Sequence, residues 1–151
     1  MSDFYQAAII GLGRIGSSYP SSYIPRTHAG AYSLNQRISI AAGVDSNSQA
    51  RKEFSQKWGS DIPVFSTVKE MLSEMQPDIV SICVPPPKLT EVVKEFTQKP
   101  PKLFFLEKPV VVDPDNSQSL SEAINKIPTA VNYHRCWDPA HIRFFEHVNK
   151  S

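Results

Sequence analysis

The sequence predicts an α/β fold in which an open, mostly parallel sheet of about six strands is doubly wound, with helices on both faces. Apolar runs of strand length alternate with helix-like stretches along all 151 residues, and this alternation is typical of parallel sheets that are buried on both sides. Glycines at positions 11, 13 and 16 follow the first run, and Asp45 closes the second. Ligands of doubly wound sheets bind where the strands end, so the residues after each run are the candidates for chemistry.

The expected elements follow from the length and boundaries of each stretch. Short apolar runs bounded by turn residues predict strands at Ala7–Gly11, Ile38–Val44, Ile62–Phe65, Ile79–Val84, Leu103–Leu106 and Ala130–Asn132. Longer stretches between or after them predict helices at Ser48–Trp58, Val68–Met75, Leu89–Lys99, Asn116–Ile127 and Ala140–Asn149. Helix caps are expected at Ser46-Asn47-Ser48 and Asp113-Pro114-Asp115, and Pro77 stops the second helix.

Residues 17–26, Ser-Ser-Tyr-Pro-Ser-Ser-Tyr-Ile-Pro-Arg, interrupt the first strand–helix unit. Two prolines and four serines in ten residues predict a loop at the point where a helix would ordinarily continue from the glycine turn. A surface insertion and a lid over a ligand are both compatible with such a loop.

The length and composition of the chain limit the classes of protein to which it can belong. The length fits one domain, and the net charge of +1 is spread along the chain, without the basic block that nucleic acid would require. Cys83 and Cys136 lie far apart, and no CxxC or HExxH spacing occurs, so reduced thiols and no metal site are expected. No window approaches the roughly 20 apolar residues of a membrane span. No secretory leader is recognisable, so a soluble, cytoplasmic protein is expected.

The glycine turn predicts a dinucleotide site. In the pattern Gly11-x-Gly13-x-x-Gly16, the first glycine permits a tight turn, the second lets a pyrophosphate approach the backbone, and the third packs helix on strand. Asp45 lies 29 residues beyond Gly16, farther than the about 20 of the simple motif, and the ten-residue loop accounts for the excess. The alternative is a glycine turn with a purely structural role.

The expected cofactor contacts come from this turn and from the strand ends. They are Gly11, Gly13, Arg14, Ile15, Gly16, Asp45, Ser46, Val84, Pro85, Glu107 and Lys108. No arginine directly follows Asp45, and a carboxylate there would repel a 2′-phosphate, so NAD is expected in preference to NADP.

Polar residues also end the later strands. Lys108, in Glu107-Lys108-Pro109 after the fifth strand, is the candidate catalytic residue, and an exposed, salt-bridged lysine is the alternative. Tyr133 and Arg135 follow the sixth strand and suit contacts with a substrate, although Arg135 could equally pair with Asp138.

Two further segments near the strand ends allow two interpretations each. The segment Val84–Pro87 could form a wall beside a nicotinamide ring or only a proline turn. His28 could reach a ligand from the first helix, but a lone histidine there is more often a surface or capping residue.

Taken together, these motifs resemble the N-terminal half of the Gfo/Idh/MocA oxidoreductase family. The resemblance runs from about residue 5 to residue 145 and rests on GLGRIG, Thr27-His28-Ala29, Val44-Asp45, the Val-Pro-Pro turn, Glu107-Lys108-Pro109 and Asn132-Tyr133-x-Arg135-x-x-Asp138-Pro139. Glu-Lys-Pro is its most specific element. The loop before "THAGAY" is similar to that of members found in surface-polysaccharide pathways.

The resemblance implies a Rossmann domain over residues 1–138 that binds NAD(H) or NADP(H). Lys108 would orient the substrate hydroxyl and its proton, while the nicotinamide exchanges the hydride. Sugars, polyols and sugar nucleotides are the implied substrates. One departure is that the family's Thr-Pro turn, with a histidine a few residues later, reads here as Val84-Pro85 and Leu89.

Residues 139–151 are expected to begin a linker helix toward a second α/β domain that this chain lacks. Ile142, Phe144, Phe145 and Val148 recur at helical spacing and would need a partner surface, so a truncated chain is expected. A homo-oligomer is also one expected assembly. This chain alone is expected to be inactive. The alternative function is a free-standing, catalytically inactive dinucleotide-binding or interaction module.

Overall fold

A computed structural model of the chain describes residues 4–20, 25–111 and 115–148. In these residues six strands form one sheet, in the order β3-β2-β1-β4-β5-β6, and all neighbouring strands are parallel. The strands are β1 (Tyr5–Ile10), β2 (Ile38–Val44), β3 (Val64–Phe65), β4 (Ile79–Ile82), β5 (Leu103–Leu106) and β6 (Thr129–Val131). The chain winds outward from β1 in both directions, so the predicted doubly wound α/β fold is confirmed.

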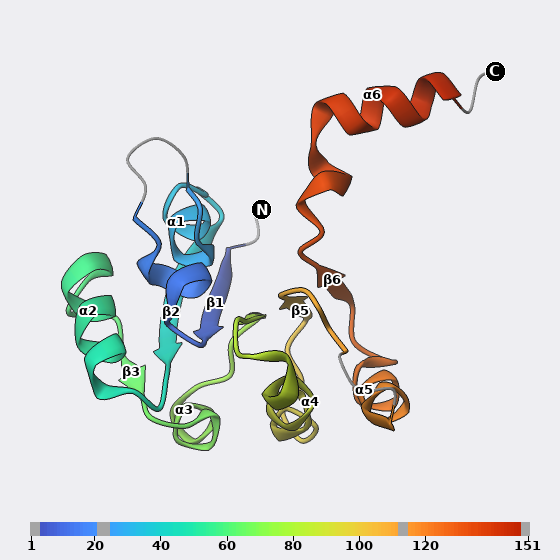
Figure 1. Ribbon diagram of the computed structural model, residues 1–151. Helices are drawn as coiled ribbons and strands as arrows, with labels where there is room; N and C mark the ends of the chain where they lie inside the picture. Colours follow the sequence, from blue (N-terminus) through green and yellow to red (C-terminus); the bar gives the residue numbers. More distant parts are fainter. Residues whose placement is uncertain (1–3, 21–24, 112–114, 149–151) are drawn as a thin grey trace.

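The helices cover both faces of this sheet, as Figure 1 shows. They are α1 (His28–Ser33), α2 (Ser48–Trp58), α3 (Val68–Glu74), α4 (Pro86–Glu95), α5 (Asp115–Ile124) and α6 (Pro139–Val148). Two shorter elements are the π-helical turn η1 (Arg14–Ser18) and the 3₁₀ turn η2 (His134–Trp137). Helices α1 and α2 pack on one face, and α3, α4 and α5 pack on the other.

The alternating residues of β1 divide the core into two apolar layers. Ala7 and Ile9 belong to the layer under α1 and α2, whereas Ala8 and Ile10 belong to the layer under α3, α4 and α5. Successive side chains of a strand point to opposite faces. Since both layers are buried, β1 is apolar throughout, which explains why the first run shows no polar alternation.

The observed ends of two elements differ from the predicted ends, because a proline sets the start of one and few paired residues limit the length of the other. Helix α4 begins at Pro86, three residues before the expected start, because proline is well suited to the first helical turn, where no N–H is needed. Only Val64–Phe65 pair with β2, so β3 is shorter than the expected strand. Residues 21–24 of the interrupting loop, the predicted cap at Asp113-Pro114 and Asn149 at the predicted end of α6 lie outside the described residues.

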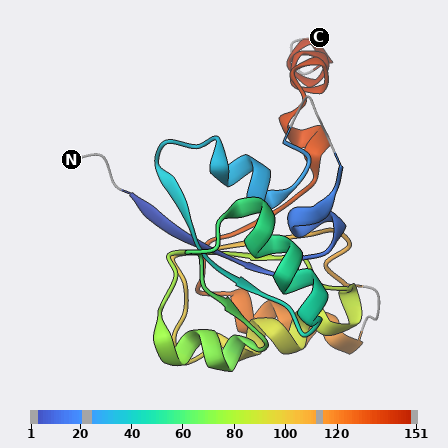
Figure 2. The ribbon, with the colours of Figure 1, turned by 90° about the vertical axis from the view of Figure 1, so that its left-hand side faces the viewer.

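Helix α6 extends away from the sheet, and Figure 2 shows it nearly end-on beyond the rest of the molecule. Its apolar side chains are solvent-exposed: Phe144 is 63% exposed and Phe145 is 61% exposed. Asp138 caps the helix by accepting a hydrogen bond from the Ala140 amide at 2.8 Å. None of the helices in the described part of the chain is long and apolar enough to cross a membrane.

Candidate cofactor and active site

A pocket of about 460 Å³ opens at the carboxyl ends of β1, β2, β3 and β4. Six predicted cofactor residues line it: Gly11, Gly13, Asp45, Ser46, Val84 and Pro85. Its walls are otherwise mostly apolar, formed by Ile10, Val44, Val68, Cys83 and Val92. Ligand pockets typically combine apolar walls with a few polar groups, which this pocket does.

Two of the glycines are required by the geometry of the turn. Gly11 has a φ of +91°, and a Cβ there would lie 2.7 Å from the carbonyl oxygen of Cys83. A Cβ on Gly16 would collide with the carbonyl oxygen of Gly11. A side chain is therefore excluded at both positions by the protein itself.

Gly13 differs from these two glycines because nothing lies within 4 Å of the position that its Cβ would take. Its backbone, with φ −68° and ψ −159°, is open to any residue. Neither packing nor backbone conformation therefore explains a glycine at this edge of the pocket. The open space beside the backbone fits the close approach of a pyrophosphate.

Asp45 fixes the turn from the end of β2. Its Oδ2 accepts a hydrogen bond from the Leu12 amide at 2.8 Å, and its Oδ1 accepts one from the Asn47 amide at 2.9 Å. An ionised carboxylate has about four acceptor positions, so two remain for ribose hydroxyls. Arg51, which the sequence analysis missed, donates to the Asp45 carbonyl at 2.6 Å.

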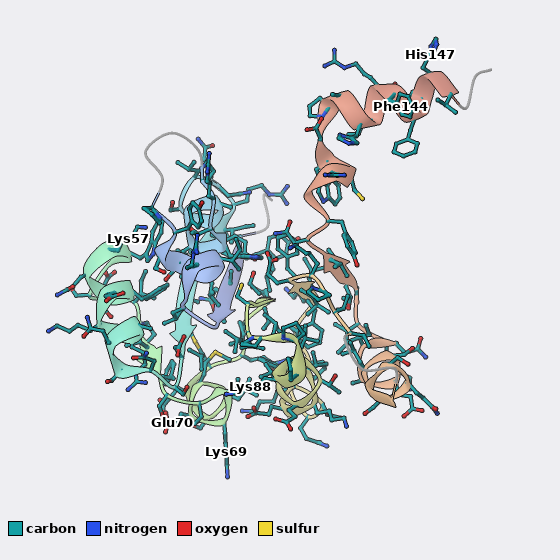
Figure 3. All side chains as sticks on the ribbon, in the orientation of Figure 1. Lys57, Lys69, Glu70, Lys88, Phe144 and His147 are labelled. Atoms are coloured by element: carbon teal, nitrogen blue, oxygen red, sulfur yellow. The ribbon has the colours of Figure 1, made fainter. Side chains whose placement is uncertain are left out.

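Further polar groups that the sequence analysis missed line the same pocket. Ser66 and Thr67 come from the end of β3, and Lys88 and Glu95 come from α4. Figure 3 labels Lys88, at the start of α4 and near α3. Burial, followed by repulsion from Glu91, raises the pKa of Glu95. The pocket therefore has both an acidic group and a cation at its rim.

A second pocket, of about 330 Å³, lies on the other side of the glycine turn. It is lined by Ile15, Pro25, Arg26, Thr27, His28, Ala31, Phe105, Glu107 and Asn132. Two predicted cofactor residues, Ile15 and Glu107, therefore face this pocket instead of the first. Arg14 is exposed, and its guanidinium lies 5.0 Å from the centre of the Tyr19 ring.

His28 lies at the centre of a buried polar network and is only 5% exposed, so its interpretation as a surface or capping residue is wrong. Its Nδ1 lies 2.8 Å from Ser81 Oγ, and its Nε2 lies 2.9 Å from Glu107 Oε1. The Tyr32 hydroxyl lies 2.6 Å from the same Ser81 oxygen, and Asn132 Nδ2 donates to Glu107 Oε1 at 2.5 Å. Residues from α1, β4 and the ends of β5 and β6 thus share one network.

The network sets the charge state of its members. Burial by itself raises the pKa of Glu107, but hydrogen bonds from His28, Asn132 and the Lys108 amide outweigh it, and the pKa is lowered. Burial raises the pKa of Tyr32 to about 12. Burial, and then the Glu107 charge, raises the pKa of the Cys83 thiol. Near pH 7, Glu107 is therefore a carboxylate while Tyr32 and Cys83 are neutral.

The remaining predicted residues, Lys108, Tyr133 and Arg135, are exposed and are not among the residues that line either pocket. Lys108 directly follows Glu107, and the peptide bond between Lys108 and Pro109 is cis. Tyr133 is 52% exposed, and Arg135 is exposed as well. Asp138 pairs with His141 at 3.5 Å. Among the described residues no ion pair joins Asp138 to Arg135.

The strand order, the glycine turn after β1 and the carboxylate after β2 define a dinucleotide-binding domain of the Rossmann type. Residues 5–133 match the family model described as "Oxidoreductase family, NAD-binding Rossmann fold". The chain therefore belongs to the Gfo/Idh/MocA oxidoreductase family. No match was found among proteins with curated functions.

Several solved structures with the same fold are described as dehydrogenases. The putative dehydrogenase from Bordetella bronchiseptica RB50 is 27% identical, with a TM-score of 0.72 over 85% of this chain and 31% of that one. Scyllo-inositol dehydrogenase from Lactobacillus casei, with bound NAD(H) and scyllo-inositol, is 18% identical, with a TM-score of 0.83 over 98% of this chain and 42% of that one.

A third relative binds a sugar nucleotide. The WlbA dehydrogenase from Chromobacterium violaceum, in complex with NADH and UDP-GlcNAcA, is 19% identical, with a TM-score of 0.71 over 87% of this chain and 35% of that one. The chain thus spans between 31% and 42% of the length of these three proteins.

Proposed function

We propose that this chain is the cofactor-binding half of an oxidoreductase that transfers hydride between NAD and a hydroxyl-bearing carbon of a sugar, polyol or sugar nucleotide. The open space at Gly13, beside the carboxylate of Asp45 in one pocket, carries the proposal. The relatives with scyllo-inositol and UDP-GlcNAcA support the substrate class. When bound, the nicotinamide supplies the hydride chemistry.

The ADP half of the cofactor is assigned to the first pocket. Gly11, Gly13 and Gly16 shape the turn that meets the pyrophosphate, with Arg14 and Ile15 beside it. Asp45 and Ser46 bind the adenosine ribose, and Val84 and Pro85 form a wall of the pocket. Because the Asp45 carboxylate would repel a 2′-phosphate, NAD is the proposed cofactor in preference to NADP.

The nicotinamide half is assigned to the side of the turn that faces Glu107 and Lys108. Cofactors of doubly wound sheets cross the edge between β1 and β4, so their second half meets the ends of β4 and β5. In the proposed reaction, Lys108 orients the substrate hydroxyl and exchanges its proton. Tyr133 and Arg135 contact the substrate from the end of β6.

A titration of NADH fluorescence with the 151-residue chain tests the proposal. Gly13→Ala should weaken NADH binding by about tenfold or more, because the added methyl group occupies the space proposed for the pyrophosphate. The melting temperature should stay unchanged, because the position is open. Ser48→Ala, an exposed change on α2, is the matched control. Equal NADH affinity in the Gly13→Ala variant would contradict the proposal.

Two additional measurements test the finer assignments. NADPH should bind about tenfold more weakly than NADH if Asp45 repels the 2′-phosphate, and Asp45→Ala should narrow this difference. An assay of sugar oxidation by the same chain tests the enzyme directly, because turnover would support it. Binding of NADH without turnover is expected both of the cofactor-binding half and of the free-standing module.

A further inference from the structure

The ring of His28 is held in one orientation by its neighbours. Phe105 meets it edge to face, with ring centres 4.8 Å apart, and Tyr32 lies 6.4 Å away. Both ring nitrogens have partners, Ser81 on one side and Glu107 on the other. A buried imidazole with both nitrogens bonded has little freedom to rotate.

The protons can be arranged so that every hydrogen bond in this network of side chains has one donor and one acceptor. The Tyr32 hydroxyl donates to Ser81 Oγ, the Ser81 hydroxyl donates to His28 Nδ1, and His28 Nε2–H donates to the Glu107 carboxylate. In this arrangement each donor has an acceptor, with one proton on the imidazole ring. The hydrogen bond from His28 to Glu107 is stronger than a bond between two neutral groups, because its acceptor is a charged carboxylate.

Glu107 receives this bond at the corner where the chain leaves β5. It is the first residue beyond the strand, on the same face as Phe105. Asn132, at the end of β6, donates to the same carboxylate oxygen, and the Lys108 amide also contacts the carboxylate. The corner is therefore held from α1 and from β6 at once.

We propose that His28 is a positioning residue that fixes the Glu107–Lys108 corner, and with it the side chain of Lys108, on the side of the glycine turn assigned to the nicotinamide. Glu107 is then an anchor for Lys108 and not a cofactor ligand. The inference rests on the proposed role of Lys108, but the contacts between His28 and the corner can be tested without any cofactor.

The cofactor-free test is hydrogen exchange of the Lys108 amide. His28→Ala should accelerate it about tenfold and leave the amides of the glycine turn unchanged. His28→Gln should restore much of the protection, because its amide provides a donor to Glu107. His141→Ala, an exposed histidine on α6, is the matched control. Asn132→Ala, which removes the other side-chain donor to Glu107, should accelerate exchange in the same way if His28→Ala folds poorly.

The second measurement compares two ligands. NADH should lose about tenfold affinity in His28→Ala, while ADP-ribose, which lacks the nicotinamide, should bind as it does to the unmodified chain. A loss of structure would weaken the binding of both ligands equally. A loss of affinity for NADH alone therefore indicates that His28 acts by positioning. His28→Gln should recover NADH binding.

The outcomes distinguish the two proposals. If the unmodified chain binds neither ligand, the proposed function fails, and the exchange of the Lys108 amide alone decides the role of His28. If both ligands bind but neither the amide exchange nor the ratio of affinities changes in His28→Ala, the positioning role is overturned. An equal loss of affinity for NADH and for ADP-ribose in His28→Ala overturns the positioning role as well.

Discussion

Gly13 and Gly16 lie three positions apart, yet only Gly16 is required by the protein's own packing. A Cβ at Gly16 would meet the Gly11 carbonyl, whereas a Cβ at Gly13 would meet open space. A sequence pattern treats the two residues alike, but the space around each distinguishes a structural glycine from one that leaves room for a ligand.

We predict that Gly16→Ala lowers the free energy of unfolding by roughly 2–3 kcal/mol, because overpacking forces backbone atoms to move. Gly13→Ala should change it by less than about 0.5 kcal/mol. Urea unfolding of the two variants measures both values. A small effect at Gly16 would show that η1 shifts to accommodate the methyl group.

Glu107 predicts a dependence of stability on pH. Although burial raises its pKa, the bonds from His28 and Asn132 leave the pKa lowered in the folded chain. The unfolded chain binds this proton near pH 4.3. The stabilisation is therefore complete above about pH 5 and is lost as the pH falls through 4 and below.

Glu107→Gln should accordingly cost about 1–2 kcal/mol at pH 7, because a neutral amide accepts these bonds more weakly than a carboxylate. The difference from the unmodified chain should shrink as the pH falls below about 4. Urea unfolding from pH 7 to pH 3 measures this difference. Glu74→Gln, an exposed change at the end of α3, controls for the loss of one titrating carboxylate. A difference that stays constant with pH would contradict the prediction.

The sequence indicated some of these residues better than others. Glycine spacing and the acid after β2 indicated the first pocket, because both follow strand ends directly. The His28 network was missed because its partners lie 53 and 79 residues away. One signal was available. Ser81 stands inside a fully buried strand, and a buried hydroxyl needs a hydrogen-bond partner.

At the scale of the elements, the N-terminus of α2 is capped by one side chain. Asn47 accepts hydrogen bonds from the Gln49 and Ala50 amides at 2.9 and 3.4 Å, as the predicted cap requires. We expect Asn47→Ala to cost about 1 kcal/mol, measured by urea unfolding. Asn47→Asp should cost much less, because the acid retains the cap and suits the positive end of the helix dipole. Equal losses in both variants would contradict the capping role.

Element boundaries were harder to predict than element types. The pattern of apolar runs predicted all six strands, because each lies in a buried sheet. The start of α4 was placed too late, because a run of prolines indicates both a turn and a first helical turn. The short α1 was not bounded from the sequence, because its partners in the core come from other elements.

In the whole molecule, α6 contributes little to the core. Figure 3 shows Phe144 and His147 on this helix, well away from the sheet. We predict that Phe144→Ser and Phe145→Ser each change the free energy of unfolding by less than about 0.5 kcal/mol. Phe104→Ala, at a position with no exposed surface, should cost about 3–5 kcal/mol. Thermal unfolding of the three variants checks this. A large loss at either α6 position would show that the helix packs against the body.

The strand order also bears on how the chain is made. The Gln6 amide at the start of β1 bonds to Asp78, 72 residues further along the chain. On a ribosome that adds about 5–20 residues per second, one side of the central strand therefore stays open for on the order of ten seconds. During that interval the nascent segment has an unpaired apolar edge, which is the kind of surface that chaperones bind.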